Sequence, residues 1–289
     1  MDVRARFEFA TAADPALNYC LWDYPPPAQG EDKFRSINLL LTSFDLAGLD
    51  PRSYAIVEAI RDAIGPFRTV FGIKLIGGRL AWEFYFYDYR RRQREVSVSR
   101  VLSAIGPFIS CAVTPSESLP YFMFSLDLDD ALAGGRRALE VVHMYIGNPG
   151  STVSSGVAYA VTAVATLLEN FYFFFDATNQ RDDVVKKITN SVYFDEANLV
   201  LDDVLVPELR NCRTICIANK QTHDCIYFSG VDVGQLLWFL ERLDYPAGIV
   251  SFVRDNRREL DHLLFDVGFD YRTGPGGLEI LKSGYYGVF

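Results

Sequence analysis

The sequence lacks the usual marks of an extracellular or membrane protein. Its five cysteines form no CxxC pair, and their odd number and loose spacing predict neither a disulfide framework nor a structural zinc site. Residues 1–6 lack the apolar segment of a signal peptide, and the longest weakly polar stretch, residues 156–168, is too short to span a bilayer. We therefore expect a soluble cytoplasmic protein without a membrane partner.

Positive charge is also scarce. The chain has 28 Lys and Arg against 37 Asp and Glu, a formal net charge of -9, and its longest run of one charge is residues 90–92. Affinity for nucleic-acid phosphates requires clustered cations. The composition therefore argues against a nucleic-acid partner.

The motifs of several common enzyme classes are missing. The sequence has no GxxxxGK[ST] phosphate loop, no GxSxG elbow and no glycine fingerprint after a strand, so nucleotide hydrolysis, ester hydrolysis and dinucleotide binding are disfavoured. The three histidines have no Glu or His partner at helical spacing, and no metal centre is expected.

Aromatic residues are abundant instead. The 289 residues include 22 Phe, 16 Tyr and 3 Trp, together 14% of the chain, and such ring surface requires a large sheet, an aromatic-lined cavity, or both. This length is near the upper limit for one hydrophobic core. We expect a single domain over residues 1–289, in which residues 1–50 form an irregular flanking segment and residues 51–289 the regular part.

Helical and strand patterns alternate from residue 51 onward. A helix over residues 51–64 has Pro at its first position and ends at a Gly-Pro pair, and residues 69–76 and 80–89 then form a hairpin around two glycines. The pentapeptide Ala-Ile-Gly-Pro-Phe occurs at residues 63–67 and again at 104–108. This suggests a repeated unit of a helix followed by a hairpin.

Four further hairpins follow the first. They pair residues 121–128 with 140–146, 170–177 with 184–194, 213–218 with 225–228, and 263–271 with 278–289. Hairpins alternating with helices build an antiparallel sheet with one covered face, and about ten such strands can close into a barrel. The predicted fold class is α+β: a ten-stranded antiparallel β-barrel with helices outside.

The alternation within the strands predicts which side chains face the lumen. One face is apolar, as at Phe71, Trp82 and Phe84, and the other collects polar residues and glycines. The predicted inner positions include Gly72, Lys74, Glu83, Tyr85, Tyr87, His143, Tyr145, Tyr227, Lys282, Gly284 and Tyr286.

Three stretches of the sequence resemble a known family. They are Ser-Leu-Asp-Leu at residues 125–128 leading to Leu-Glu-Val-Val-His-Met-Tyr-Ile at 139–146, residues 214–230, and Leu-Glu-Ile-Leu-Lys-Ser-Gly-Tyr-Tyr at 278–286. Together with the hairpin repeat, they resemble the ABBA-type, or prenyltransferase-barrel, aromatic prenyltransferases. Within this family, the succession of helices and hairpins is most similar to that of the cyanobactin peptide prenyltransferases. The last stretch is also similar to the Lys-x-Gly-x-Tyr-Tyr ending of bacterial soluble aromatic prenyltransferases.

The resemblance implies prenyl transfer. A dimethylallyl or geranyl diphosphate ionises inside the barrel, and an aromatic small molecule or a peptide side chain attacks the carbocation. The family works without an aspartate-rich metal motif, and the nearest approach to one, residues 127–130, lacks the required spacing. No cofactor is therefore expected to be required, and Mg²⁺ is expected at most to assist.

The resemblance and the predicted faces together suggest four residues for diphosphate binding. Lys282 and Tyr286 share a strand face across Gly284, although a solvated lysine on an edge strand is the alternative. Lys74 and Arg213 are further candidates, with an exposed lysine and a rim charge as their alternatives. Cations at these places would stabilise the diphosphate as it leaves.

Two residues are candidates for catalysis. Glu83 would be the base that deprotonates the acceptor, but the family base usually lies on the first strand, where this sequence has Val70 and Gly72; a salt bridge to Lys74 is the alternative. His143 matches a histidine of the peptide-modifying branch, although a lone histidine is more often a hydrogen-bonded core residue. The rings expected to shield the carbocation are Tyr85, Tyr87, Tyr121, Tyr145 and Tyr227.

Two other functions are compatible with the sequence. One is a non-catalytic barrel that binds an apolar ligand or a partner peptide, and the other is a β-rich interaction protein with a filled core. A cavity on which at least three cationic or tyrosyl groups converge would separate them, because a filled core has none.

Overall fold

The computed structural model describes residues 7–89, 94–148 and 154–289. Its ten strands form a closed antiparallel barrel in the order β1-β10-β9-β8-β7-β6-β5-β4-β3-β2, which confirms the predicted fold class. The strands are β1 (Thr69–Ile76), β2 (Arg79–Tyr87), β3 (Met123–Leu128), β4 (Val142–Asn148), β5 (Ser154–Val161), β6 (Thr166–Asp176), β7 (Thr214–Lys220), β8 (Asp224–Val231), β9 (Phe265–Gly274) and β10 (Gly277–Val288).

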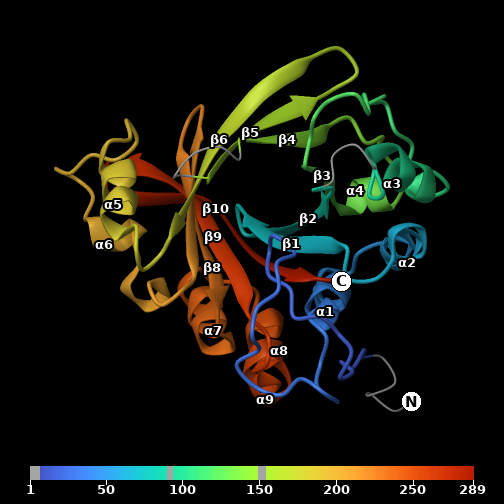
Figure 1. Ribbon diagram of the computed structural model, residues 1–289, viewed down its shortest axis with the longest axis horizontal. Coiled ribbons are helices and arrows are strands. Elements are labelled where there is room, and N and C mark those ends of the chain that lie inside the picture. Colours follow the sequence, from blue (N-terminus) through green and yellow to red (C-terminus); the bar gives the residue numbers. More distant parts are fainter. Residues whose placement is uncertain (1–6, 90–93, 149–153) are drawn as a thin grey trace.

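Helices cover the outside of the barrel (Figure 1). They are α1 (Ile37–Ala47), α2 (Arg52–Ile64), α3 (Val98–Ile105), α4 (Asp130–Ala133), α5 (Arg181–Thr189), α6 (Leu201–Val204), η2 (Pro207–Leu209), α7 (Val233–Arg242), α8 (Ala247–Asp255) and α9 (Arg257–Leu260). Helix α1 lies within residues 1–50, so the description of that whole segment as irregular is wrong. No helix of the described ranges is both long and apolar enough to cross a membrane.

The third predicted hairpin is wrong. Its true strands are β5 and β6, while residues 184–189 of the segment 184–194, which was assigned to its second half, belong to helix α5. Two aspartates occupy the first turn of this helix, and Val184 and Ile188 bury one face at i, i+4 spacing. Strand β5 is built largely from Ser, Gly and Ala, which are weak strand formers, so its alternation gave little signal.

The two faces of the sheet differ in composition as the alternation predicts. The outer face packs Phe71, Trp82 and Phe124 against the helices, and complete burial of such a side chain stabilises the fold by roughly 1.5–3 kcal/mol. A second, inner cluster includes Tyr85, Tyr87, Tyr145 and Tyr286. The lumen is therefore lined with phenol rings.

Residues 7–36 cross one end of the barrel before α1 begins (Figure 1). Isolated bridges pair Phe9 with Phe34 and Leu17 with Asp23, and a tight turn follows Asn18, whose side-chain oxygen accepts hydrogen bonds from the N–H groups of Cys20 and Trp22. We call these residues the N-terminal segment. The opposite end of the barrel carries the β1–β2, β7–β8 and β9–β10 turns and is called the lysine end below.

Candidate active site

Tyrosine rings line the middle of the lumen. The ring centroids of Tyr85 and Tyr286 are 5.8 Å apart, those of Tyr227 and Tyr286 are 6.0 Å apart, and Tyr145 pairs with Tyr172 at 5.7 Å. These rings come from β2, β4, β6, β8 and β10, and each occupies one of the inner positions that recur at every second residue of a strand. Together they present several π faces to whatever occupies the centre.

Glycines on neighbouring strands make room for these rings. A Cβ atom at Gly72 would lie 2.6 Å from the Tyr286 ring, and one at Gly268 would lie 2.5 Å from the Tyr227 ring. Both distances are shorter than carbon atoms tolerate. Glycine at each position therefore fixes the inward placement of a tyrosine.

Tyr19 is a ring of the lumen that the sequence did not reveal. It descends from the N-terminal segment, and its ring centroid lies 4.9 Å from that of Tyr286 and 5.4 Å from that of Tyr85. It also lies 6.4 Å from both Tyr87 and Tyr227. No periodicity marks Tyr19, because it belongs to no strand.

Three lysines converge at the lysine end. Lys74 forms ion pairs with Glu83 and, at 3.0 Å, with Asp127. Lys220 and Lys282 share Asp270, at 2.8 Å and 3.2 Å from its Oδ2. Lys220 was missed because its strand was expected to end at residue 218, whereas β7 continues to Lys220.

The three lysines differ in how well their charges are compensated. Burial disfavours the charge of Lys74, but Glu83 and Asp127 outweigh it and raise its pKa. Burial together with the charges of Lys220 and Lys74 lowers the pKa of Lys282, and Asp270 compensates only in part. Lys282 is therefore the cation that gains most from an additional anion.

Glu83 lies in the lumen, and its carboxylate already accepts several donors. Besides Lys74, it accepts a hydrogen bond from the Tyr85 hydroxyl at 2.5 Å and one from the Ser125 hydroxyl. Burial opposes its ionisation, but Lys74 outweighs burial and lowers the pKa of Glu83. Its proton affinity is therefore weaker than that of an ordinary carboxylate.

His143 lies between two carboxylates at the lysine end. Its Nδ1 is 2.7 Å from Glu169 and its Nε2 is 3.2 Å from Asp127. Burial would lower the pKa of His143, but these two hydrogen bonds outweigh it and raise the pKa to about 10. At neutral pH the imidazole is therefore a cation, which adds to the positive charge of the lysine end.

A cavity of about 480 Å³ opens among these groups. It lies among Lys74, Glu83, His143, Lys282 and Tyr286, which come from four strands of the barrel. Within the described ranges, no group of three or more His, Cys, Asp or Glu is arranged to hold a metal ion. The expectation that Mg²⁺ is dispensable stays a prediction.

Two predicted site residues lie outside the tyrosine-lined lumen, whereas Tyr87 faces the lumen without lining this cavity. A bend at Phe122 precedes β3, and Tyr121 packs in the outer core, with its ring 5.7 Å from Phe124 and under the Arg94 guanidinium at 3.6 Å. Its assignment as a cation shield is wrong, because the strand alternation does not extend back to residue 121. The other four predicted shield tyrosines face the lumen.

Arg213 is the second residue that the structure separates from the lysines. It directly precedes β7, whose far end carries Lys220, so the two lie roughly 20 Å apart along the strand. Its guanidinium lies 5.5 Å from the Tyr24 ring. Arg213 is therefore a charge at the opposite rim, as the alternative had it, and the structure does not bring it together with the lysines.

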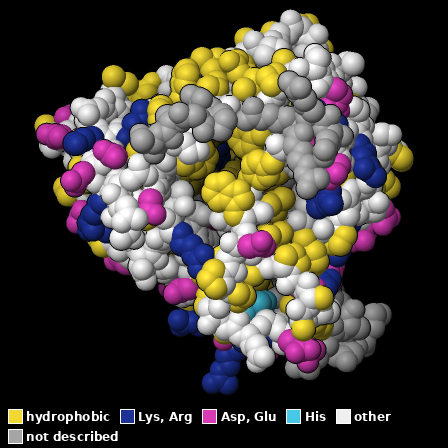
Figure 2. All heavy atoms as spheres, in the orientation of Figure 1, with side chains coloured by type: hydrophobic (Ala, Val, Ile, Leu, Met, Phe, Trp, Pro, Cys, Tyr) yellow, Lys and Arg dark blue, Asp and Glu magenta, His cyan; other side chains and the backbone are white. Residues whose placement is uncertain are grey.

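The barrel end beneath the N-terminal segment contains a buried acid that forms no ion pair with any described residue. Asp266, on the inner face of β9, accepts a hydrogen bond from the Tyr19 N–H at 2.8 Å. Burial raises the pKa of Asp266 to about 6, although Ser229 and backbone N–H groups favour its ionised form. The face of the molecule seen in Figure 2 is hollowed, and hydrophobic side chains line the hollow.

Comparisons with known proteins identify the fold. The sequence matches no protein-family model and no curated protein. Among solved structures, the chain is similar to 6-dimethylallyltryptophan synthase from Micromonospora olivasterospora in complex with DMASPP and Trp, with a TM-score of 0.51 and 11% sequence identity. The alignment covers 86% of this chain and 95% of that one. At this identity the likeness shows a common barrel fold.

Proposed function

We propose that this protein transfers a short prenyl group, dimethylallyl or geranyl, from its diphosphate to an aromatic or peptide side-chain acceptor. The observation that carries the proposal is the convergence of Lys74, Lys220 and Lys282 at one end of a closed lumen whose middle is lined with tyrosines. This order matches the two parts of an allylic diphosphate, an anion followed by a hydrocarbon that becomes a cation.

The lysines bind the diphosphate and stabilise it as it leaves. Lys282 has the least compensated charge, and its side chain is 26% exposed at the edge of the cavity. The side chain of Asp127 is 49% exposed, so it can turn away from Lys74 as the phosphate oxygens arrive. Fixed cations then stabilise the negative charge that develops on the leaving group.

The tyrosines protect the carbocation. Their rings attract a cation through their π faces. Ten strands close the lumen, and Tyr19, here called the tyrosine plug, fills its middle, so that water is excluded from the carbocation. His143 has no free lone pair while it is protonated, so its role is electrostatic: it adds positive charge beside the diphosphate.

The neighbour of known structure supports this reading. That synthase was solved with DMASPP, a thiolo analogue of dimethylallyl diphosphate, and with tryptophan. Its barrel aligns with most of this chain, so a diphosphate donor and an aromatic acceptor fit the same architecture. A peptide acceptor remains part of the proposal on the basis of the sequence resemblance alone.

A second function deserves comparison because every lysine of the site is already paired with a carboxylate. Such internal pairing favours a non-catalytic barrel that binds an apolar ligand or a partner peptide. The cavity of about 480 Å³ disfavours the third possibility, an interaction protein with a filled core. Donor binding separates the first two.

The test is to incubate the full chain with dimethylallyl and geranyl diphosphates and a set of aromatic acceptors that includes tyrosine- and tryptophan-containing peptides. Mass spectrometry then detects products heavier by one isoprenoid unit. A thermal shift with DMASPP, measured in parallel, reports donor binding. If the chain shows neither donor binding nor prenyl transfer across the set, only the non-catalytic function remains.

A further inference from the structure

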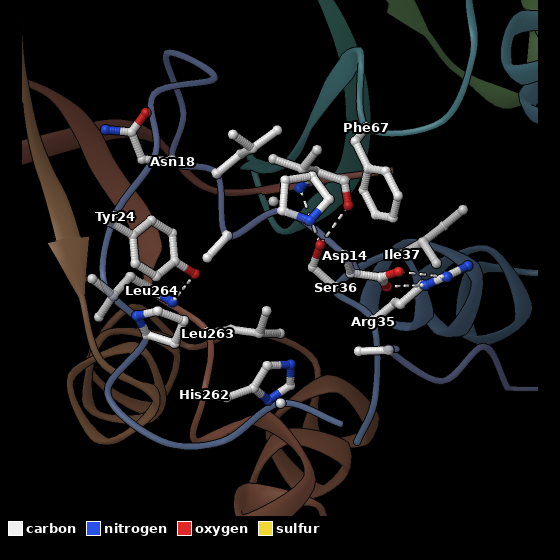
Figure 3. A pocket seen from close by; sticks show the side chains of 18 of the residues that line it. Asp14, Asn18, Tyr24, Arg35, Ser36, Ile37, Phe67, His262, Leu263 and Leu264 are labelled. Carbon is white, nitrogen blue, oxygen red and sulfur yellow. Dashed lines mark hydrogen bonds and ion pairs between the residues drawn. The ribbon is translucent and has the colours of Figure 1, made fainter. Parts of the chain in front are cut away.

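A second cavity lies between the N-terminal segment and the barrel (Figure 3). Its volume is about 520 Å³, which is in the range of small-molecule sites. In Figure 3, His262 and Leu263 form one side, and Asp14 paired with Arg35 lies on the other. Nothing in the proposed donor site accounts for this space.

Two buried polar atoms of the cavity wall lack a partner in the described part of the chain: Asp266 Oδ1 and His262 Nδ1. Both residues are more than nine-tenths buried, with 3% and 7% of their surfaces exposed. Buried polar atoms are normally satisfied, so unpaired ones mark a place where a ligand forms the missing hydrogen bonds.

The charges around this cavity favour a neutral ligand. Arg35 is held by Asp14 and Glu8, and Arg61 is held by Glu8. Burial, followed by the charge of Lys33, lowers the pKa of His262, so its imidazole is neutral at pH 7. A carboxylate and a neutral imidazole suit a molecule that donates hydrogen bonds and buries an apolar ring.

This cavity adjoins the lumen. Asp266, Tyr19 and Tyr286 line it, and Tyr286 also lines the cavity at the lysine end. Asp266 and Asp270 share the inner face of β9, about 13 Å apart along the strand. A short prenyl chain on a diphosphate held at Asp270's end therefore points toward Asp266.

We infer that the cavity beneath the N-terminal segment binds the acceptor, an aromatic molecule with an N–H or O–H donor, and that Asp266 Oδ1 takes the acceptor's proton. This inference rests on the proposed prenyl transfer. The bond between the acceptor atom and C1 of the prenyl group forms, the C1–O bond breaks, and its electron pair leaves with the diphosphate. The acceptor's proton passes to Asp266.

Asp266 suits this role better than Glu83. Lys74, Tyr85 and Ser125 occupy the Glu83 carboxylate, whereas Asp266 has one free oxygen and no cationic partner among the described residues. A base whose proton affinity lies near the working pH is effective, and burial brings the pKa of Asp266 to about 6.

The test is calorimetric titration of indole and 1-methylindole, which lacks the N–H donor, into the full chain saturated with DMASPP. We expect the wild type to bind indole at least fivefold more tightly than 1-methylindole, because 1-methylindole cannot donate a hydrogen bond to the charged carboxylate of Asp266. Asp266→Asn should lose this preference. Asp224→Asn is the control, since Asp224 is equally buried but lies outside the lumen, against Asn219.

A variant whose larger side chain fills the cavity locates the binding site. Ala16 lines the cavity, whereas Ala13, three residues earlier, is exposed and does not. Ala16→Trp should weaken indole binding at least tenfold, while Ala13→Trp leaves it unchanged and both retain DMASPP affinity. Unchanged indole binding in Ala16→Trp, or a preference for indole that survives in Asp266→Asn, would overturn the acceptor site.

The proton transfer is tested by turnover with dimethylallyl diphosphate and indole. Asp266→Asn should lower the transfer rate about 100-fold or more, while Asp224→Asn retains the wild-type rate. The proton-accepting role would be overturned if the wild type and Asp266→Asn transferred the prenyl group at equal rates, including the case in which neither shows any turnover. If DMASPP does not bind but the indole pattern holds, the proposed function fails and the cavity stands as a binding site.

Discussion

The two ends of the lumen shift the pKa of a buried aspartate in opposite directions. Asp270 and Asp266 lie on one face of β9, four residues apart, and each is 3% exposed. His223, Lys220 and Lys282 outweigh burial and lower the pKa of Asp270, whereas burial raises the pKa of Asp266. Partners rather than depth therefore set the charge of a buried carboxylate.

This difference assigns a task to each end. The lysine end holds fixed positive charges that an anion can approach, while the end beneath the N-terminal segment holds Asp266, which has no ion-pair partner among the described residues, and a cavity of about 520 Å³. Between them, the tyrosines form a neutral, polarisable middle. The following experiments test this difference between the two ends of the lumen.

The largest expected effect is on stability at the lysine end. Asp270→Asn leaves Lys220 and Lys282 buried without their shared counter-ion, and removing one partner of a buried ion pair costs about 3–5 kcal/mol. Urea unfolding at pH 7 measures the loss. Asp224→Asn is the control, and an equal free energy of unfolding for Asp270→Asn and the control would mean that the lysines do not need Asp270.

Removal of the least compensated cation should chiefly affect turnover. Lys282→Ala removes a donor to the departing diphosphate, which we expect to lower kcat about 100-fold or more with the fold intact. Lys186→Ala, on the exposed face of α5, is the matched control. Wild-type activity in Lys282→Ala would remove this residue from the site.

Asp266→Asn should have the opposite effect on stability from Asp270→Asn. Burial raises the pKa of Asp266 to about 6, against 3.8 for an aspartate in the unfolded chain, so at pH 7 the buried charge destabilises the wild type by about 3 kcal/mol. Wild-type stability therefore rises as pH falls from about 6 towards 3.8, and the advantage of the variant should vanish near pH 4. Unfolding measured at pH 7 and pH 4 tests the sign; a variant less stable than the wild type at pH 7 contradicts the contrast.

The tyrosine plug should have a smaller effect, on product distribution. Tyr19→Ala opens the middle of the lumen to water, because this ring contacts Tyr85 and Tyr286. We expect about a tenfold rise in prenyl alcohol relative to prenylated product, which corresponds to the loss of one cation–π contact. Tyr54→Ala, on helix α2 outside the barrel, should leave the product ratio at the wild-type value.

The smallest effect is expected from metal removal. EDTA should leave transfer within a few-fold of its rate in Mg²⁺, because lysines and His143 supply the positive charge. Complete loss of turnover in EDTA, restored by Mg²⁺, would contradict this expectation.

The sequence predicted the barrel because alternation survives in its most aromatic strands. Strand pairs β1–β2, β3–β4, β7–β8 and β9–β10 appear where the pattern placed hairpins, and the inner positions from Lys74 to Tyr286 were read from parity alone. The β5–β6 hairpin was missed because Ser, Gly and Ala carry little strand signal. A bend at Phe122 likewise hid the true position of Tyr121.

The candidate site was predictable only in part. Lys74, Glu83, His143 and Lys282 face the lumen as expected, since each follows strand alternation. Tyr19 and Asp266 were not identified: one lies in a segment without periodicity, and the other gains its importance from the partners it lacks. The absence of a partner is a property of three-dimensional packing and leaves no trace in residue spacing.

The central claim is that the lysine end holds a diphosphate whose hydrocarbon part enters the tyrosine-lined lumen. Calorimetric titration of DMASPP into the wild type and Lys282→Ala tests it most directly. We predict saturable binding to one site in the wild type and at least tenfold weaker binding in the variant, with Lys186→Ala unchanged. The absence of binding in the wild type, or equal affinity in the wild type and Lys282→Ala, would contradict the claim.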